Sequence, residues 1–141
     1  MLVNLNKLFM NSKLFFIQLN EINFELVDKY IQASNEKNFV NLKYVKNFFN
    51  NFSTFAEDEY DNLEPWIQWA SVHLGKDYKN HRIFRLGDIV NHPQQKQIFE
   101  IIETKGFKVG AISPMNAENR LKDSAYFISD PWTDTQSDSS N

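Results

Sequence analysis

The feature that most constrains the fold is a near-continuous apolar run, KLFFIQL, at residues 13–19, closed by Asn20. Runs of this kind suit a strand buried on both faces of a parallel sheet. Asn23 follows shortly and can cap a helix that carries Phe24 and Val27 at helical spacing. A strand followed at once by a helix is the opening of a βα unit.

A second segment, residues 65–74, has residues at both ends that favour the boundaries of a helix. Proline is favoured at the first helical position, where Pro65 stands, and Gly75 fits the left-handed position after the last. No residue from Pro65 to Leu74 is an acid, a lysine or an arginine, and Trp66, Trp69 and His73 fall on one face. We therefore expect this helix to be almost wholly buried, with the tryptophans in the core and His73 as a hydrogen-bonded core histidine.

The remaining elements follow from the same signals. Their residue ranges are a helix over 39–49, a short strand over 52–56, a solvated acidic loop over 57–61, an extended connector over 81–86, a helix from Asn91 or His92 with Pro93 to Lys105-Gly106, a strand over 107–112 and a short strand over 126–128. In the helix before Lys105, the expected core stripe is Ile98, Ile101 and Ile102.

This order predicts an α/β fold with three layers, a mostly parallel sheet carrying helices on both faces. Residues 13–132 form the domain, residues 1–12 a loose arm, and the polar tail 133–141 is expected to be disordered. Ligands of such sheets bind at the carboxyl ends of the strands. Asn20, Glu21, Ser113 and Asn116 lie at those ends.

Composition narrows the function classes. The chain has 141 residues, enough for one domain, and a net charge of -3 that gives no reason to expect nucleic acid as a partner. It contains no cysteine, which excludes disulfides, zinc–thiolate sites and cysteine nucleophiles. No apolar run approaches the roughly 18 residues of a membrane span. No signal peptide is recognisable, so the compartment is unknown, with the cytoplasm as the default.

Three segments together resemble the alkaline phosphatase superfamily, which includes phosphatases, sulfatases, nucleotide phosphodiesterases and phosphoglycerol transferases. They are FFIQLNEINFELV at residues 15–27, EPWIQWASVHLGKDYKNHRIF at 64–84 and GFKVGAISPMNAENR at 106–120. The resemblance covers residues 13–135. Within it, NLEPWIQWASVH, IFRLGDIV and AYFISDPWTDT are similar to an uncharacterised subgroup of that superfamily.

The resemblance implies a metal-dependent hydrolase or transferase of phosphate or sulfate esters, with glycan-linked esters among the candidate substrates. Asn20-Glu21 stands where the family has an aspartate metal ligand followed by glycine, so Glu21 and Asn20 become candidate ligands of a Zn or Mn ion. Glu64 stands where the family has a Ser or Thr nucleophile at a helix start. The family's other ligands lie downstream of residue 141, so we expect an N-terminal fragment that is inactive alone and holds no metal tightly.

Other interpretations of the same residues remain open. Glu21 also suits the first turn of the helix begun at Asn23, and Glu64 suits the cap region of its helix, because carboxylates there meet the helix dipole favourably. The missing hydroxyl at Glu64 favours an alternative function, a non-catalytic module of the same fold that binds a glycan or nucleotide sugar. A truncated parallel sheet leaves an open edge, so we also expect poor solubility or self-association.

Overall fold

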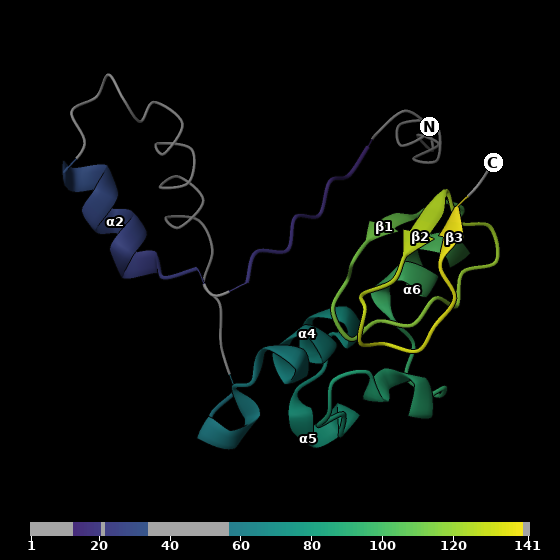
Figure 1. The fold of residues 1–141 in the computed structure, drawn as a ribbon, viewed down its shortest axis with the longest axis horizontal. Coiled ribbons are helices and arrows are strands. Elements are labelled where there is room, and N and C mark those ends of the chain that lie inside the picture. The colour runs from purple at the N-terminus through teal and green to yellow at the C-terminus, as the bar shows by residue number, and fades with distance from the viewer. Residues whose placement is uncertain (1–12, 21, 34–56, 140–141) are drawn as a thin grey trace, which may run out of the picture.

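The computed structural model describes residues 13–20, 22–33 and 57–139. Residues 57–139 form one packed unit, while the helix α2 (Phe24–Ala33) stands apart from it (Figure 1). The expected start of α2 is confirmed, since the Asn23 side chain accepts a hydrogen bond from the Leu26 backbone N–H at 2.9 Å. The predicted helix over 39–49, the short strand over 52–56, the arm 1–12 and Glu21 lie outside the described residues.

The sheet consists of three short strands in the order β1-β2-β3: β1 is Gly110–Ile112, β2 is Tyr126–Ile128 and β3 is Asp138–Ser139. β1 and β2 are parallel, with Ala111 opposite Phe127, and β3 runs antiparallel to β2. A parallel pair together with helices makes this a mixed α/β fold. We expected disorder from Thr133 onward, but Thr133 is buried and the chain after it returns to pair with β2.

One face of the sheet is covered by α6 (Ile98–Thr104). Phe99 and Phe127 meet edge to face with ring centroids 6.1 Å apart, and Ala111 is buried beside them. The stripe expected for this helix is right only in part: Ile98 and Ile102 pack partly buried against this core, but Phe99 is the buried residue and Ile101 is 42% exposed. The helix also begins later than expected, at Ile98, where Gln97 donates its backbone N–H to the Glu100 carboxylate at 2.9 Å.

The segment between α4 and α6 folds into two single turns that the sequence did not reveal. α5 (Tyr78–His81) ends at the first residue of the expected extended connector, and η2 (Asp88–Asn91) ends where the next helix was expected to begin. Their local causes are visible: the Asp77 side chain accepts the Asn80 backbone N–H at 3.0 Å, and Gly87 takes φ of 78° just before η2. The 3-10 turn η1 (Tyr60–Asn62) lies within the acidic loop.

The helix α4 (Pro65–Leu74) has the predicted bounds, with Pro65 in its first turn and Gly75 left-handed at φ of 61°. Ile67, Ala70, His73 and Leu74 are buried, whereas Val72 is 44% exposed, so the helix is less buried than expected. Ala70 and Leu74 pack with residues from the segment that follows α5, chiefly Ile83 and Ile89. This second cluster holds α4 against the segment from α5 to η2, and α4 also contacts α6 directly.

Residues 13–19 do not form the buried strand that their composition predicts. The segment is extended, but its apolar side chains are exposed and it belongs to none of the described strands. The sequence signal reports how apolar the segment is, and a strand forms only where a neighbouring backbone receives its hydrogen bonds.

Candidate functional site

The carboxyl end of β2 carries a buried aspartate. Asp130 is 2% exposed and lies two residues after the end of β2, before Pro131. Its carboxylate accepts the backbone N–H groups of Trp132 at 2.8 Å and Thr133 at 3.0 Å, and the Thr133 hydroxyl at 2.6 Å. It also accepts the backbone N–H of Asn116 at 3.0 Å, from the segment that follows β1. Four donors compensate the desolvation of this carboxylate and tie together the ends of two parallel strands.

Asn116 extends this link to α4. The residue is fully buried at φ of 52°, a left-handed conformation that asparagine tolerates better than most residues. Its side-chain Nδ2 donates to the Trp66 carbonyl at 3.0 Å and to the Arg85 carbonyl at 3.3 Å. Its Oδ1 accepts the Ile89 N–H at 3.4 Å. One amide therefore joins the first turn of α4 to the carboxyl end of β1.

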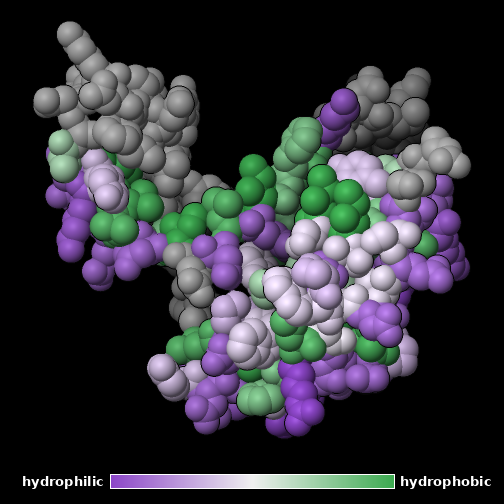
Figure 2. Space-filling view, viewed as in Figure 1, coloured by the Kyte–Doolittle hydropathy of each residue, from purple (hydrophilic) through white to green (hydrophobic). Residues whose placement is uncertain are grey.

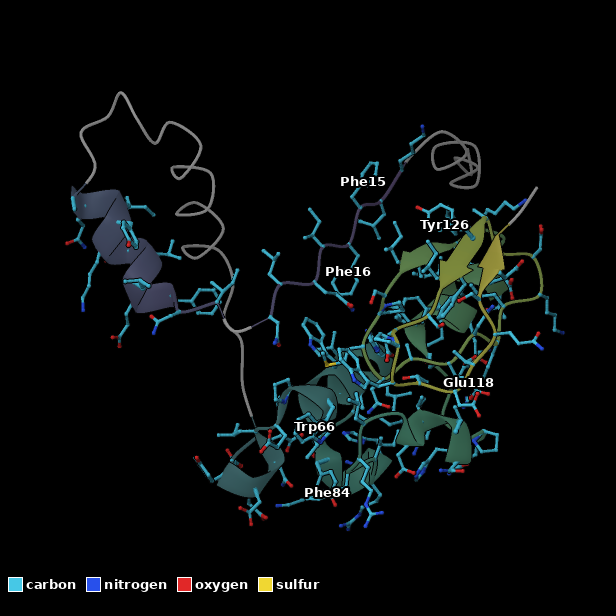
Figure 3. All side chains as sticks on the ribbon, viewed as in Figure 1. Phe15, Phe16, Trp66, Phe84, Glu118 and Tyr126 are labelled. Carbon is cyan, nitrogen blue, oxygen red and sulfur yellow. The ribbon has the colours of Figure 1, made fainter. Side chains whose placement is uncertain are left out.

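Glu64 lies at the start of α4, the end that Asn116 fixes. It is exposed, occupies the cap position and makes no capping hydrogen bond through its side chain. The first turn is held further by the Trp66 indole, which donates to the Phe84 carbonyl at 2.9 Å, and Figure 3 shows these two residues side by side. The Glu64 carboxylate is thus presented to solvent from a rigid helix start.

The candidate ligands are not brought together with Glu64 by any described contact. Asn20 is exposed, in a turn after the extended segment, and Glu21 falls outside the described residues. The extended segment instead forms a hydrogen bond near the other end of α4, where the Gln18 and His73 side-chain Nε2 atoms are 2.6 Å apart. Over the parts of the chain that can be described, no three potential ligands gather in a group able to hold a metal ion.

His73 is a core histidine, as expected. It is 1% exposed, stacks on Trp69 and lies 5.1 Å from the Phe99 ring, centroid to centroid. Burial lowers its pKa to about 4, although the backbone of Asn116 and the charge of Asp130 both favour the protonated ring. The ring is therefore neutral near pH 7. The His73 Nε2 atom lies within hydrogen-bond distance of the Gln18 amide nitrogen, which can only donate.

A serine–histidine pair that the sequence did not reveal lies on the other side of α4. The Ser71 hydroxyl is 2.9 Å from His81 Nε2 and 3.3 Å from the Glu57 carboxylate. However, His81 Nδ1 accepts the Ile83 backbone N–H at 3.0 Å, so in the neutral ring the proton is on Nε2 and points at Ser71. Burial also lowers the His81 pKa. A histidine in this tautomer cannot take the serine proton. The pair is therefore a structural hydrogen bond and not a nucleophile with its base.

An open cleft of about 540 Å³ borders this pair. Its polar lining includes Glu57, Asp58 and Asp77 together with Lys76 and Lys79. Two of these groups already have partners, since Glu57 accepts the Tyr78 N–H at 2.6 Å and Lys76 donates to Gln95 at 2.6 Å. The cleft therefore offers mixed charge without a converging set of free ligands.

The sequence identified only part of this arrangement. Asn116 was placed at a strand end, and Glu64 at a helix start. Asp130 was missed, although an aspartate directly before proline after a strand is a turn signal that could have pointed to it. Ser71 and His81 are ten residues apart across a turn, with no spacing that marks a site.

In comparisons with family models, curated proteins and solved structures, nothing matches this chain. None of the helices in the described ranges is long and apolar enough to cross a membrane.

Proposed function

We propose that this chain is the N-terminal part of a metal-dependent hydrolase or transferase of phosphate or sulfate esters, with the three-layer α/β architecture of the alkaline phosphatase superfamily. The substrate is a small phosphate or sulfate ester, and a glycan-linked ester is one candidate. The same proposal includes this small-molecule ester as the partner and the cytoplasm as the default location. It begins from the sequence resemblance and gains support from one feature of the fold.

The supporting observation is the Asn116 link. Its side chain holds the Trp66 carbonyl at 3.0 Å, and its backbone N–H binds Asp130 at 3.0 Å. The start of α4 consequently lies at the carboxyl ends of the parallel strands β1 and β2, the edge where ligands bind in parallel sheets. An ester hydrolase of this type requires that arrangement, because the attacking group acts from the helix start.

Glu64 is the candidate attacking or positioning group at that edge. A helix N-terminus stabilises a bound anion, but the carboxylate of Glu64 repels one, and these two effects oppose each other. Among the described residues no three-ligand set fits a Zn or Mn ion, so we derive no chemical step through a metal. Glu21 and Asn20 stay the proposed ligands, with the other ligands contributed from outside the described residues.

The alternative proposal is a non-catalytic module of the same fold that binds a glycan or nucleotide sugar. The sequence Asn62-Leu63-Glu64-Pro65, which offers no hydroxyl at the helix start, favours it. In that case the exposed Glu64 at the start of α4 contributes binding without attack on an ester.

The test is an assay of the protein expressed from its whole reading frame, with Zn²⁺ or Mn²⁺ and p-nitrophenyl phosphate, bis-p-nitrophenyl phosphate or p-nitrophenyl sulfate. We expect metal-dependent hydrolysis, and we expect Glu21→Ala and Glu64→Gln each to lower kcat/KM by about a hundredfold or more. Glu59→Gln, a change of the same kind at an exposed acid outside the site, is the matched control.

The outcomes separate the two proposals. Unchanged activity in Glu21→Ala would show that Glu21 is not part of the site. Absence of hydrolysis in every metal condition, combined with saturable calorimetric binding of a nucleotide sugar such as UDP-glucose that Glu64→Gln alters, supports the binding module instead.

A further inference from the structure

In the extended segment 13–19, side-chain exposure alternates from Phe15 to Leu19 as it does in a strand. Phe15 is 81% exposed, Phe16 56% and Ile17 74%, and Gln18 is half-buried. Figure 3 shows Phe15 and Phe16 leaving the backbone on opposite sides. Phe16 and Gln18 are less exposed than the residues beside them, which is the period of two of an edge strand, while Leu14 at 82% exposure lies outside this stretch.

The strand β1 has a free edge that such a segment can occupy. Within the described sheet β1 pairs only with β2. The Val109 carbonyl accepts the Ala125 N–H, and the Ser113 N–H donates to the Ile128 carbonyl, both at 2.7 Å. Because the direction of hydrogen bonding alternates along a strand, Gly110 and Ile112 direct their backbone groups away from β2. These groups form the unpaired edge.

The Gln18 contact sets the direction of approach. Gln18 lies near the end of the segment and meets the His73 ring, which is close to the backbone of Asn116 and to Asp130. Those two residues follow the carboxyl ends of β1 and β2. The end of the segment thus lies at the same edge of the sheet as the ends of β1 and β2, so the segment runs parallel to them.

The outer face of the sheet provides a second uncovered surface. α6 covers one face, while Ile112, Tyr126 and Ile128 remain exposed on the other. Figure 2 shows apolar side chains along the 13–19 segment and on the adjoining surface where β1 lies. α2 follows the segment after a short turn, has no buried residue and exposes Phe24, Leu26 and Tyr30. A helix that follows a strand this closely packs back on the same sheet.

We propose that residues 13–19 close onto the free edge of β1 as a parallel fourth strand, with α2 carried over the outer face of β1 and β2. The Gln18–His73 contact is the part of this closed state that is already made. Closure pairs the backbone groups of Gly110 and Ile112 and removes the apolar side chains of α2 and the outer face from water. This inference does not rest on the proposed ester chemistry.

Amide hydrogen exchange of the intact chain tests the pairing. We expect the amides of Gly110 and Ile112 to exchange at least about tenfold more slowly than in the double variant Phe16→Pro/Ile17→Pro, which removes two adjacent N–H groups from the segment. Lys13→Pro, at the first residue of the segment, is the control and should leave the protection in place. Equal exchange of these two amides in the native chain and the double variant overturns the proposal.

Cysteine pairs identify the occupant of the edge, because the native chain has no cysteine. Ile17→Cys or Leu19→Cys combined with Ile112→Cys should form a disulfide within one chain under dilute oxidising conditions, since neighbouring strands bring Cα atoms into bonding range. Lys13→Cys with Ile112→Cys, four residues or more out of register, should not. A disulfide formed only between two chains, or no disulfide in either pair, overturns closure within one chain.

Discussion

At the scale of single residues, two buried polar groups determine how the ends of the elements meet. Asn116 and Asp130 make between them hydrogen bonds to α4, to the connector before η2 and to the turn after β2. Each bond stabilises the fold modestly on its own. Removing one partner leaves the others buried without hydrogen bonds, which costs more than the bond itself contributes.

Replacement of Asn116 should therefore be severe. Asn116→Ala leaves the Trp66 and Arg85 carbonyls and the Ile89 N–H without this partner, and we expect the free energy of unfolding to fall by about 3–5 kcal/mol. Asn116→Gly loses the same bonds but tolerates φ of 52°, so it should be about 1 kcal/mol less destabilised than the alanine variant. Urea denaturation of both variants measures this difference, and equal stability of the two would show that backbone strain is negligible here.

The buried histidine predicts a pH dependence of stability. The folded-state pKa of His73 is lowered to about 4, whereas an unfolded histidine titrates near its ordinary value of 6.5. The unfolded state binds a proton first as pH falls, so stability is complete above pH 6.5 and declines toward pH 4. The loss amounts to about 3 kcal/mol.

His81 acts in the same direction, because burial lowers its pKa too. His73→Gln should flatten the profile between these pH values, while His92→Gln, at a partly exposed site, should retain it. Urea denaturation at pH 7 and pH 4.5 gives the comparison. A His73→Gln profile as steep as the native one would contradict the assignment.

At the scale of elements, the connector from η2 to α6 depends on one arginine. The Arg120 guanidinium donates to the carbonyls of Ile89 at 3.0 Å and Gln95 at 2.8 Å, and it also contacts the Glu118 carboxylate. Gln97 adds a two-point link, donating to the Glu118 carbonyl at 2.9 Å and accepting the Glu118 N–H at 3.0 Å. Side chains thus take the place of a regular ladder between the connector and the segment after β1.

Arg120→Lys tests this role. A lysine keeps the charge but lacks the planar fork that reaches several carbonyls at once, so we expect a loss of about 2–4 kcal/mol in unfolding free energy. Amide hydrogen exchange in the region of Ile89 and Gln95 should accelerate as well. Lys122→Arg, at a nearby exposed position, is the control and should have no measurable effect. Native stability in Arg120→Lys would show that charge alone is sufficient.

At the scale of the whole molecule, the exposed apolar side chains determine the behaviour in solution. The self-association expected from the sequence stays a prediction, and closure of residues 13–19 limits it by covering the edge of β1. We expect Phe16→Pro/Ile17→Pro to sediment as larger, concentration-dependent species than the native chain, because an open edge pairs with other chains. Sedimentation velocity over a range of concentrations measures this, and a proline variant that stays as small as the native chain would contradict it.

Local signals in the sequence determined several elements by themselves. Pro65 and Gly75 predicted the bounds of α4, Asn23 the start of α2, and the run at 126–128 the strand β2. These predictions succeed because a proline, a left-handed glycine and a capping asparagine act on their own neighbours in the chain. The position of Glu64 at a helix start was predictable for the same reason.

Only the tertiary structure decided which surfaces meet. Phe99 rather than Ile101 faces the core because Phe127 offers it a partner, and Asn116 joins α4 to β1 across 50 residues of sequence. Residues 13–19 are apolar enough for a buried strand, yet their exposure depends on whether β1 receives their backbone hydrogen bonds. Burial and pairing are properties of two segments at once, and a pattern within one segment cannot specify its partner.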